Sequence, residues 1–118
     1  MIKIKHSFSN SLEVDIEGHS GAAPMGEDLY CAGISVLTVA LACALKDAKS
    51  QGYIEELSLD VREGDTHIKA IPKVGFEPIV QTIFTTIFNG YDAMSISFPD
   101  YVSFQPRGVE TPDNSAVG

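Results

Sequence analysis

The apolar run from Leu29 to Leu45 restricts this chain more than any other part of its sequence. The run is about 17 residues long, which is the lower limit for a transmembrane helix, and Ser35 and Thr38 interrupt it. We therefore interpret it as a buried helix of a globular protein and expect no membrane partner. Acidic residues at one end and lysines at the other complement a helix dipole, so the helix is expected from about Asp28 to Lys49.

A helix that is apolar nearly all round needs to be covered on more than one side. A monomeric domain of two layers covers one side of each helix. The remaining apolar surface therefore predicts a second copy of the chain, and we expect a homodimer.

The rest of the sequence predicts two β-hairpins, a second helix and a last strand. Ile2 to Phe8 and Leu12 to Ile16 alternate between apolar and polar residues, which is typical of a hairpin with one buried face and one charged face. The elements expected after the first helix are strands at Leu57–Val61 and Thr66–Ile71, a helix from Pro78 to Asn89-Gly90, and a final strand over Met94–Phe98 and Tyr101–Phe104 that bends at Pro99.

This order is strand-strand-helix twice, followed by a strand. It predicts an α+β two-layer sandwich in which two helices lie on one face of a mixed, mostly antiparallel sheet. The chain has 118 residues, which is the size of one domain. We expect that domain to cover residues 1–107, and the polar, proline-containing segment 108–118 to be a disordered tail.

Charge and cysteine content exclude some functions and locations. The net charge is −8 with eight Lys and Arg residues, which argues against a nucleic-acid-binding protein. The two cysteines lie twelve positions apart in one predicted helix, too far to form a disulfide. The first residues, Met-Ile-Lys-Ile-Lys-His, alternate instead of forming the apolar region of a signal peptide. We expect a cytoplasmic protein with free thiols.

Four residues around the start of the first helix carry the chemistry. Cys31 is placed in the first helical turn, where the positive end of the helix dipole favours a thiolate. His19 lies across a glycine-rich loop, from which its imidazole could accept the thiol proton. Asp28 and Ser35 lie three and four residues from Cys31 and share its helix face. On these residues alone, a functional and a structural Cys31 are about equally supported, with capping by Asp28 as the structural explanation. For His19 taken alone, satisfying backbone groups of its turn is the favoured interpretation.

The loop before the helix contains Gly18, Gly21 and Gly26. These glycines permit positive φ angles and the close approach of another chain. A phosphate-binding loop is the competing interpretation, because glycine loops before helices bind anions. Neither the Walker lysine nor the dinucleotide-binding spacing is present, so a mobile lid over the thiol is favoured.

The remaining cysteine and histidines are interpreted as structural. Cys43, in the middle of the helix between two alanines, is expected to be a small buried hydrophobic residue. His6 shares the inward parity of its apolar neighbours, and His67 is expected to be exposed on a hairpin. A zinc site needs about four ligands, and the sequence offers no second Cys/His cluster, so we expect no metal and no cofactor.

Two segments, Gly18–Gly21 and Gly26–Ser35, resemble the motifs of a known family. The ribosomal-processing cysteine proteases of bacteria have the pattern Gly-His-x-Gly, then Gly-x-Asp-apolar-x-Cys-Ala-x-apolar-Ser, at this spacing. The resemblance also covers the length of the chain, the order of its elements and the small residues of the first helix. It implies a homodimeric cysteine endopeptidase that removes a short N-terminal extension from a large-subunit ribosomal protein, cutting after an aromatic-rich segment.

The same resemblance implies that Cys31 is the nucleophile and His19 the general base, with Asp28 and Ser35 in supporting roles. We expect the glycine-rich loop to open for an extended peptide and to close over it. The thiolate would then attack the scissile carbonyl, and His19 would return the proton to the leaving amine. Backbone N–H groups at the helix start, including that of Cys31, are expected to hold the oxyanion.

The alternative from another functional class is a non-enzymatic, ribosome-associated dimeric binding protein in which the loop is a docking surface. A thiol redox sensor is less favoured, because Cys43 is three turns from Cys31 on another helix face. Departures from the family pattern at Ala22, Pro24, Met25 and Tyr30 bear on substrate preference. Gly33 stands where alanine is common, and it should cost the helix about 1 kcal/mol.

Overall fold

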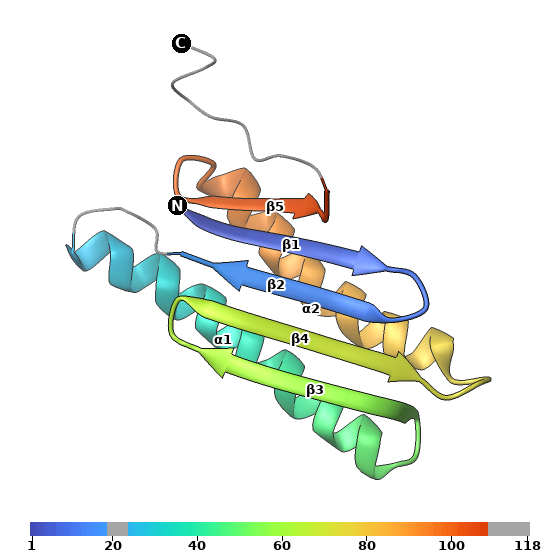
Figure 1. Cartoon of the computed structure of the whole chain (residues 1–118). Helices are drawn as coiled ribbons and strands as arrows, with labels where there is room; N and C mark the ends of the chain where they lie inside the picture. Colours follow the sequence, from blue (N-terminus) through green and yellow to red (C-terminus); the bar gives the residue numbers. More distant parts are fainter. Residues whose placement is uncertain (19–23, 109–118) are drawn as a thin grey trace.

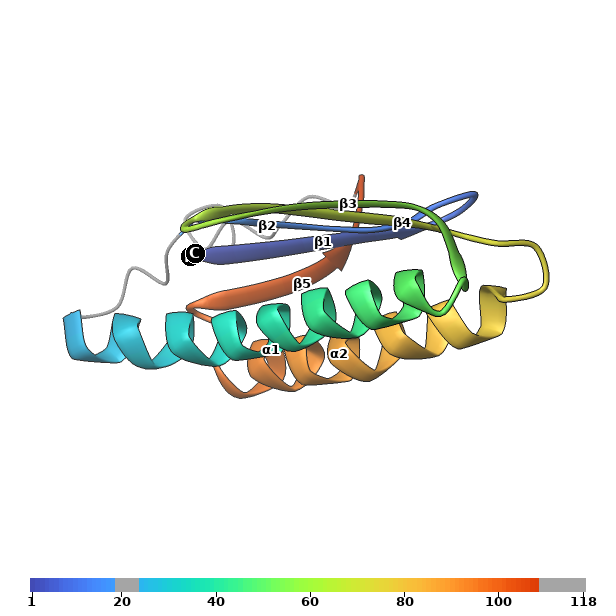
Figure 2. The same ribbon diagram turned by 90° about the horizontal axis from the view of Figure 1, so that it is seen from below.

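The computed structural model describes residues 1–18 and 24–108, with residues 24–29 described by their backbone alone. It consists of one five-stranded sheet and two helices that cover the same face of it (Figures 1 and 2). The elements are β1 (Ile2–Phe8), β2 (Leu12–Glu17), α1 (Pro24–Ser50), β3 (Ile54–Arg62), β4 (Asp65–Pro72), α2 (Glu77–Ser97) and β5 (Val102–Pro106). The predicted α+β sandwich is confirmed. The predicted tail lies outside the described residues, except for Gly108.

The sheet has the order β3-β4-β2-β1-β5, and its pairs are antiparallel except for β1 with β5, which are parallel. The two hairpins therefore join through β2 and β4, where Val14 faces Ile68 across the ladder. This arrangement confirms the prediction of a mixed, mostly antiparallel sheet. It also brings the β3–β4 turn to the end of the sheet where β2 finishes, because Glu17 pairs with Asp65.

The core lies between the sheet and the two helices. Alternate residues of the strands face the helices and are buried, as the period-two pattern predicts. The helices contribute two stripes at helical spacing, which consist of Ile34, Leu41, Leu45 and Ala48 in α1 and of Val80, Phe84, Phe88 and Tyr91 in α2. His6 also faces inward, as expected, with its ring 4.7 Å from that of Phe104 and 5.1 Å from that of Phe88. Burial lowers the pKa of His6.

The predicted start of the first helix, at about Asp28, is wrong. The helix α1 begins at Pro24, four residues before Asp28, and ends at Ser50. Proline suits the first turn of a helix, since it lacks the N–H that would be unpaired there. Gly26 and Asp28 therefore lie inside α1 and not in a loop or at a cap, and Cys31 is the eighth residue of the helix.

The predicted end of the second helix, at Asn89-Gly90, is also wrong. The helix α2 continues through Asn89-Gly90 to Ser97, so Met94–Phe98 is not a strand and only Val102–Pro106 forms the last one. Two glycines explain why the helix continues. A Cβ on Gly90 would lie 2.8 Å from Cδ2 of Leu37, and a Cβ on Gly33 would lie 3.1 Å from Cε of Met94. Glycine at these positions lets α1 and α2 pack closely, and this packing outweighs the low helix propensity of glycine.

Among the described residues, the sheet and α2 cover one face of α1 and leave another exposed. Val36 and Val39 are 69% and 56% exposed, and Cys43 is exposed as well, so the expectation that Cys43 is buried is wrong. From Tyr30 to Ser50 the helix has the length and hydropathy of a membrane span, a test that core helices also meet. Leu41 and Leu45 are fully buried in the core, so one apolar side of α1 is explained by its packing within the domain. The homodimer stays a prediction.

Candidate active site

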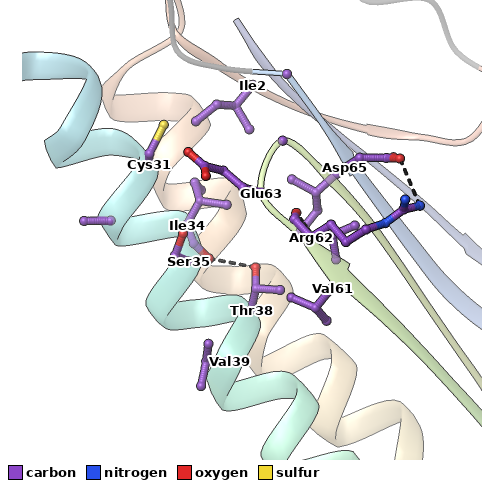
Figure 3. Close-up of a pocket in the computed structure, with 15 residues that line it drawn as sticks. Ile2, Cys31, Ile34, Ser35, Thr38, Val39, Val61, Arg62, Glu63 and Asp65 are labelled. Carbon is purple, nitrogen blue, oxygen red and sulfur yellow. Dashed lines mark hydrogen bonds and ion pairs between the residues drawn. The ribbon is translucent and has the colours of Figure 1, made fainter. Parts of the chain in front are cut away.

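A pocket of about 380 Å³ lies between the first half of α1 and the end of the sheet where β2 finishes (Figure 3). The helix contributes Cys31, Ile34, Ser35 and Thr38 to its wall. The opposite wall is formed by Ile2, Ile16 and Gly18 of the sheet and by the β3–β4 turn, residues 62–66. The pocket therefore combines four segments of the sequence, which lie around Ile2, Ile16, Ser35 and Glu63.

Cys31 is the cysteine that lines this pocket, and it is partly exposed there. Figure 3 shows its side chain on α1, while Ile2 of β1 and Glu63 of the β3–β4 turn line the same pocket. Cys43 lies three turns further along the same helix and does not line the pocket. The structure thus separates the two thiols as the spacing predicts, with one at a pocket and one outside it.

Two expectations about the activation of Cys31 are wrong, because α1 begins earlier than predicted. The field of a helix dipole falls off within the first turn, and Cys31 lies about two turns from the helix start. The N–H of residue 31 in such a helix bonds to the carbonyl of residue 27, so it is not a free donor for an oxyanion. A catalytic thiolate at this position needs a partner other than the helix terminus.

The predicted base, His19, lies outside the described residues, together with Gly21 and Ala22. Gly18, which directly precedes His19 in the sequence, lines the pocket. Its φ is +91°, as expected for a glycine at this point, and its N–H donates a 3.0 Å hydrogen bond to the carbonyl of Gly64. A Cβ on Gly18 would lie 2.6 Å from the carbonyl oxygen of Met1. Gly18 thus joins the end of β2 to the β3–β4 turn where no larger residue fits.

Of the two predicted supporting residues, Ser35 and Asp28, the described side chain is that of Ser35, and it lines the pocket. Ser35 lines the pocket one helical turn from Cys31 and is exposed, so these two predicted site residues do come together. The capping role considered for Asp28 is wrong, because the helix begins before it, and its side chain is not among those described. Its orienting role toward the imidazole stays a prediction.

A buried polar network, which no motif of the sequence indicated, reaches the pocket wall at Thr38. The hydroxyl of Thr38 donates to the carbonyl of Ile34 at 2.7 Å and shares a 2.8 Å hydrogen bond with the Tyr91 hydroxyl. Burial raises the pKa of Tyr91 to about 12, although the hydrogen bond to Thr38 acts in the opposite direction. The network ties α1 to α2 directly below the residues that line the pocket.

The β3–β4 turn is a part of the site that was not predicted from the sequence. Arg62, Glu63 and Asp65 line the pocket opposite Cys31. The guanidinium of Arg62 forms ion pairs with Asp60 at 3.0 Å and with Asp65 at 3.4 Å. The turn itself is visible in the sequence as Arg-Glu-Gly-Asp, but only the strand order brings it to the helix.

The outer face of the sheet carries an ion-pair network beside the pocket. The Nδ1 and Nε2 atoms of His67 lie 2.8 Å from Asp15 and 2.7 Å from Asp65. Ionised carboxylates only accept hydrogen bonds, so the protonated imidazolium form of His67, in which both ring nitrogens donate, fits both contacts. Its hydrogen bond to Asp15 raises the pKa of His67, with a smaller contribution from Asp65. The side chain of His67 is 43% exposed and the residue as a whole is half-buried, so it is less exposed than predicted.

Glu17, Asp65 and His67 have ligand atoms within 4.8 Å of one another, a spacing that a metal ion could bridge. An imidazolium has no free lone pair for a metal ion. These residues therefore fit a salt-bridge network better than a metal centre.

Comparisons with known proteins concern the family and the fold of the chain. A family model described as cysteine protease Prp matches residues 1–103. A crystal structure of an essential ribosomal processing protease Prp from S. aureus, in complex with a covalently linked product peptide, has a TM-score of 0.73 at 18% identity and covers 91% of this chain and 100% of that one. The same protease with a substrate peptide has a TM-score of 0.68 at 14% identity, with the same coverage. SMU.848 from Streptococcus mutans has a TM-score of 0.64 at 22% identity and covers 90% and 93%. No curated protein matches the chain.

Proposed function

The chain belongs to the cysteine protease Prp family, and from this premise we propose that Cys31 is its nucleophile and His19 its general base. The observation that carries the proposal is the position of Cys31 in a pocket of about 380 Å³, while the second thiol lies outside it. A peptide segment that enters this pocket would meet a partly exposed sulfur and the exposed hydroxyl of Ser35.

The reaction that we propose is acyl transfer through a thioester. His19 takes the proton of the Cys31 thiol, and the thiolate attacks the scissile carbonyl carbon. The C–N bond breaks as His19 returns the proton to the leaving amine, and water then hydrolyses the thioester. Because the helix terminus is too distant to stabilise the thiolate, the imidazole carries the activation. Ser35 and Asp28 have supporting roles in which they orient groups but do not react.

The substrate that we propose is the short N-terminal extension of a large-subunit ribosomal protein, cut by a homodimer in the cytoplasm. The motif spacing supports this substrate, as does the fold that the chain shares with a protease described as ribosomal processing. The free thiols support the location, and the exposed apolar stripe on α1 supports the dimer. The glycine-rich segment that begins at Gly18 would close over the bound peptide.

The test is cleavage of a ribosomal protein that carries its N-terminal extension, followed by mass spectrometry. We expect the wild type to release the extension, Cys31→Ala to release none, and His19→Ala to be slowed by at least about a hundredfold. Cys43→Ala is the matched control and should cleave like the wild type. Stable binding of the substrate without product would instead support the non-enzymatic binding protein.

Thiol labelling gives an independent measurement. Cys43 is exposed and will also react with iodoacetamide, so labelling has to be resolved by peptide mapping. We expect Cys31 to label faster than Cys43 at neutral pH, and His19→Ala to remove this difference, because the proposed base takes the proton of the Cys31 thiol. Equal labelling rates for the two cysteines in the wild type would contradict an activated Cys31.

A further inference from the structure

The β3–β4 turn places an unpaired carboxylate in the same pocket as Cys31. Within the described part of the chain, the other charged residues that line the pocket are engaged with partners. Arg62 pairs with Asp60 and Asp65, and Asp65 also pairs with His67. Glu63 has no hydrogen-bond or ion-pair partner among the described residues, and its side chain reaches from the turn toward α1 (Figure 3).

The position of Glu63 is held by the backbone of the turn. Gly64 has a φ of +75°, and its carbonyl accepts the hydrogen bond from the N–H of Gly18. The hydroxyl of Thr66 donates to the carbonyl of Arg62 at 3.1 Å and closes the other side of the turn. The carboxylate is therefore carried by an anchored turn and not by a free loop.

The charge around the pocket is negative. The single guanidinium in its lining is already shared between two carboxylates, so the charge of Glu63 is not neutralised within the described residues. Glu63 is exposed and borders the pocket, so a cation that enters the pocket meets a carboxylate that has no partner among the described residues. The net charge of −8 acts in the same direction at longer range.

We propose that Glu63 is a specificity-determining residue that binds a Lys or Arg side chain of the substrate close to the scissile bond. The proposal rests on the proposed peptidase function of Cys31, because both residues line one pocket and a peptide bound there would contact both. Because Glu63 is exposed, its ion pair with a substrate cation adds only modestly to affinity. We therefore expect an effect on kcat/KM of roughly two- to fivefold for the substrate position that Glu63 contacts.

The test uses peptides that span the cleaved bond and differ at one position at a time, carrying Lys, Ala or Glu within three residues of that bond. For the wild type, kcat/KM should be highest with Lys and lowest with Glu at one position. Glu63→Gln should remove this preference, and Glu63→Lys should invert it. Raising the ionic strength should reduce the wild-type preference, since salt screens the pair.

Glu56→Lys is the matched control. Glu56 is exposed on β3 and lies seven residues from Glu63 along the chain, which is about 23 Å in an extended strand. The two substitutions change the net charge equally, so Glu56→Lys should keep the wild-type order of peptides. Thermal unfolding of each variant checks that it folds.

The outcomes separate the two proposals. If the wild type cleaves the peptides and Glu63→Lys keeps the same order of preference, the role of Glu63 is wrong and the peptidase function stands. If Glu56→Lys inverts the preference as well, net charge decides it and the role of Glu63 is again wrong. If the wild type cleaves none of the peptides and no ribosomal substrate, the proposed function fails and this inference fails with it.

Discussion

At the scale of single residues, the site depends on which thiol the fold leaves beside a pocket. Both cysteines lie on α1, but one helix face is turned toward the sheet and the turn, while the other face is left uncovered. Cys31 and Ser35 are one turn apart on the first of these faces. The proposal that Cys31 is the nucleophile thus rests on which helix face borders the pocket and not on a measured reactivity of either thiol.

Gly18 is the residue whose replacement should disturb the pocket most directly. Gly18→Ala places an L side chain at a φ of +91° and brings its Cβ to 2.6 Å from a backbone carbonyl oxygen. We expect the free energy of unfolding to fall by about 2 kcal/mol or more, as measured by urea denaturation.

Gly52→Ala separates the two causes of that loss. Gly52 also has a positive φ, +85°, but no atom lies within 4 Å of a Cβ built there. It should lose only the backbone contribution, about 1 kcal/mol. Equal losses in the two variants would mean that the close approach of Met1 to Gly18 has no energetic weight.

At the scale of the elements, β2, β4 and the end of β5 are joined on the open face of the sheet by charge. Burial raises the pKa of Asp15, but hydrogen bonds from His67 and Arg107 outweigh this effect and leave the pKa lowered. The pKa of His67 is raised for the reciprocal reason. The network therefore stabilises the fold in the pH range where Asp15 is ionised and His67 is protonated.

This network predicts a specific dependence of stability on pH. A histidine whose pKa is raised by folding contributes its full stabilisation below its unfolded pKa of about 6.5 and loses it as pH rises through the folded pKa. The free energy of unfolding of the wild type should therefore fall as pH rises above about 6.5. In His67→Asn this fall should be reduced, as measured by urea denaturation across pH 6 to 9. Parallel curves for the two proteins would show that His67 does not couple folding to pH.

The packing of α1 against α2 belongs to the same scale. Gly33 and Gly90 each lie where the other helix approaches, and neither glycine can be explained from its own helix alone. The helix propensity of glycine costs about 1 kcal/mol at each position. Closer contact between the two helices offsets this cost, which is why Asn89-Gly90 does not end α2.

At the scale of the whole molecule, the uncovered face of α1 predicts self-association. Val36, Ala40 and Cys43 are exposed at helical spacing on the side away from the core. Val36→Lys with Ala40→Lys would place unpaired charges in an interface formed by this face. We expect self-association to weaken by more than about tenfold, as measured by light scattering across a concentration series.

Val74→Lys is the control for that experiment. Val74 is 95% exposed and lies in the connection between β4 and α2, away from the face in question. It should leave the oligomeric state unchanged. A wild type that is monomeric at all concentrations would contradict the homodimer, and a dimer that survives the α1 substitutions would place the interface elsewhere.

The sequence by itself determined the elements whose pattern is local. Alternation over Ile2–Phe8 and Leu12–Ile16 specified a hairpin with one buried face, because side chains on a strand alternate between its faces. Apolar spacing specified two helices, and the Cys31 and Ser35 pair was placed on one helix face by a separation of four residues. These relations hold within a few residues, so the order of the amino acids is enough to establish them.

The tertiary structure alone decided the helix limits and the opposite wall of the pocket. The ends of α1 and α2 depend on packing energies that exceed the local preferences of Asp28 and Gly90. Glu63 faces Cys31 only because the strand order β3-β4-β2 places the β3–β4 turn at the end of β2. Cys31 and Glu63 line one pocket because strands pair and the helix layer packs on the sheet. These relations join residues that are far apart in the chain, so no local pattern of residues predicts them.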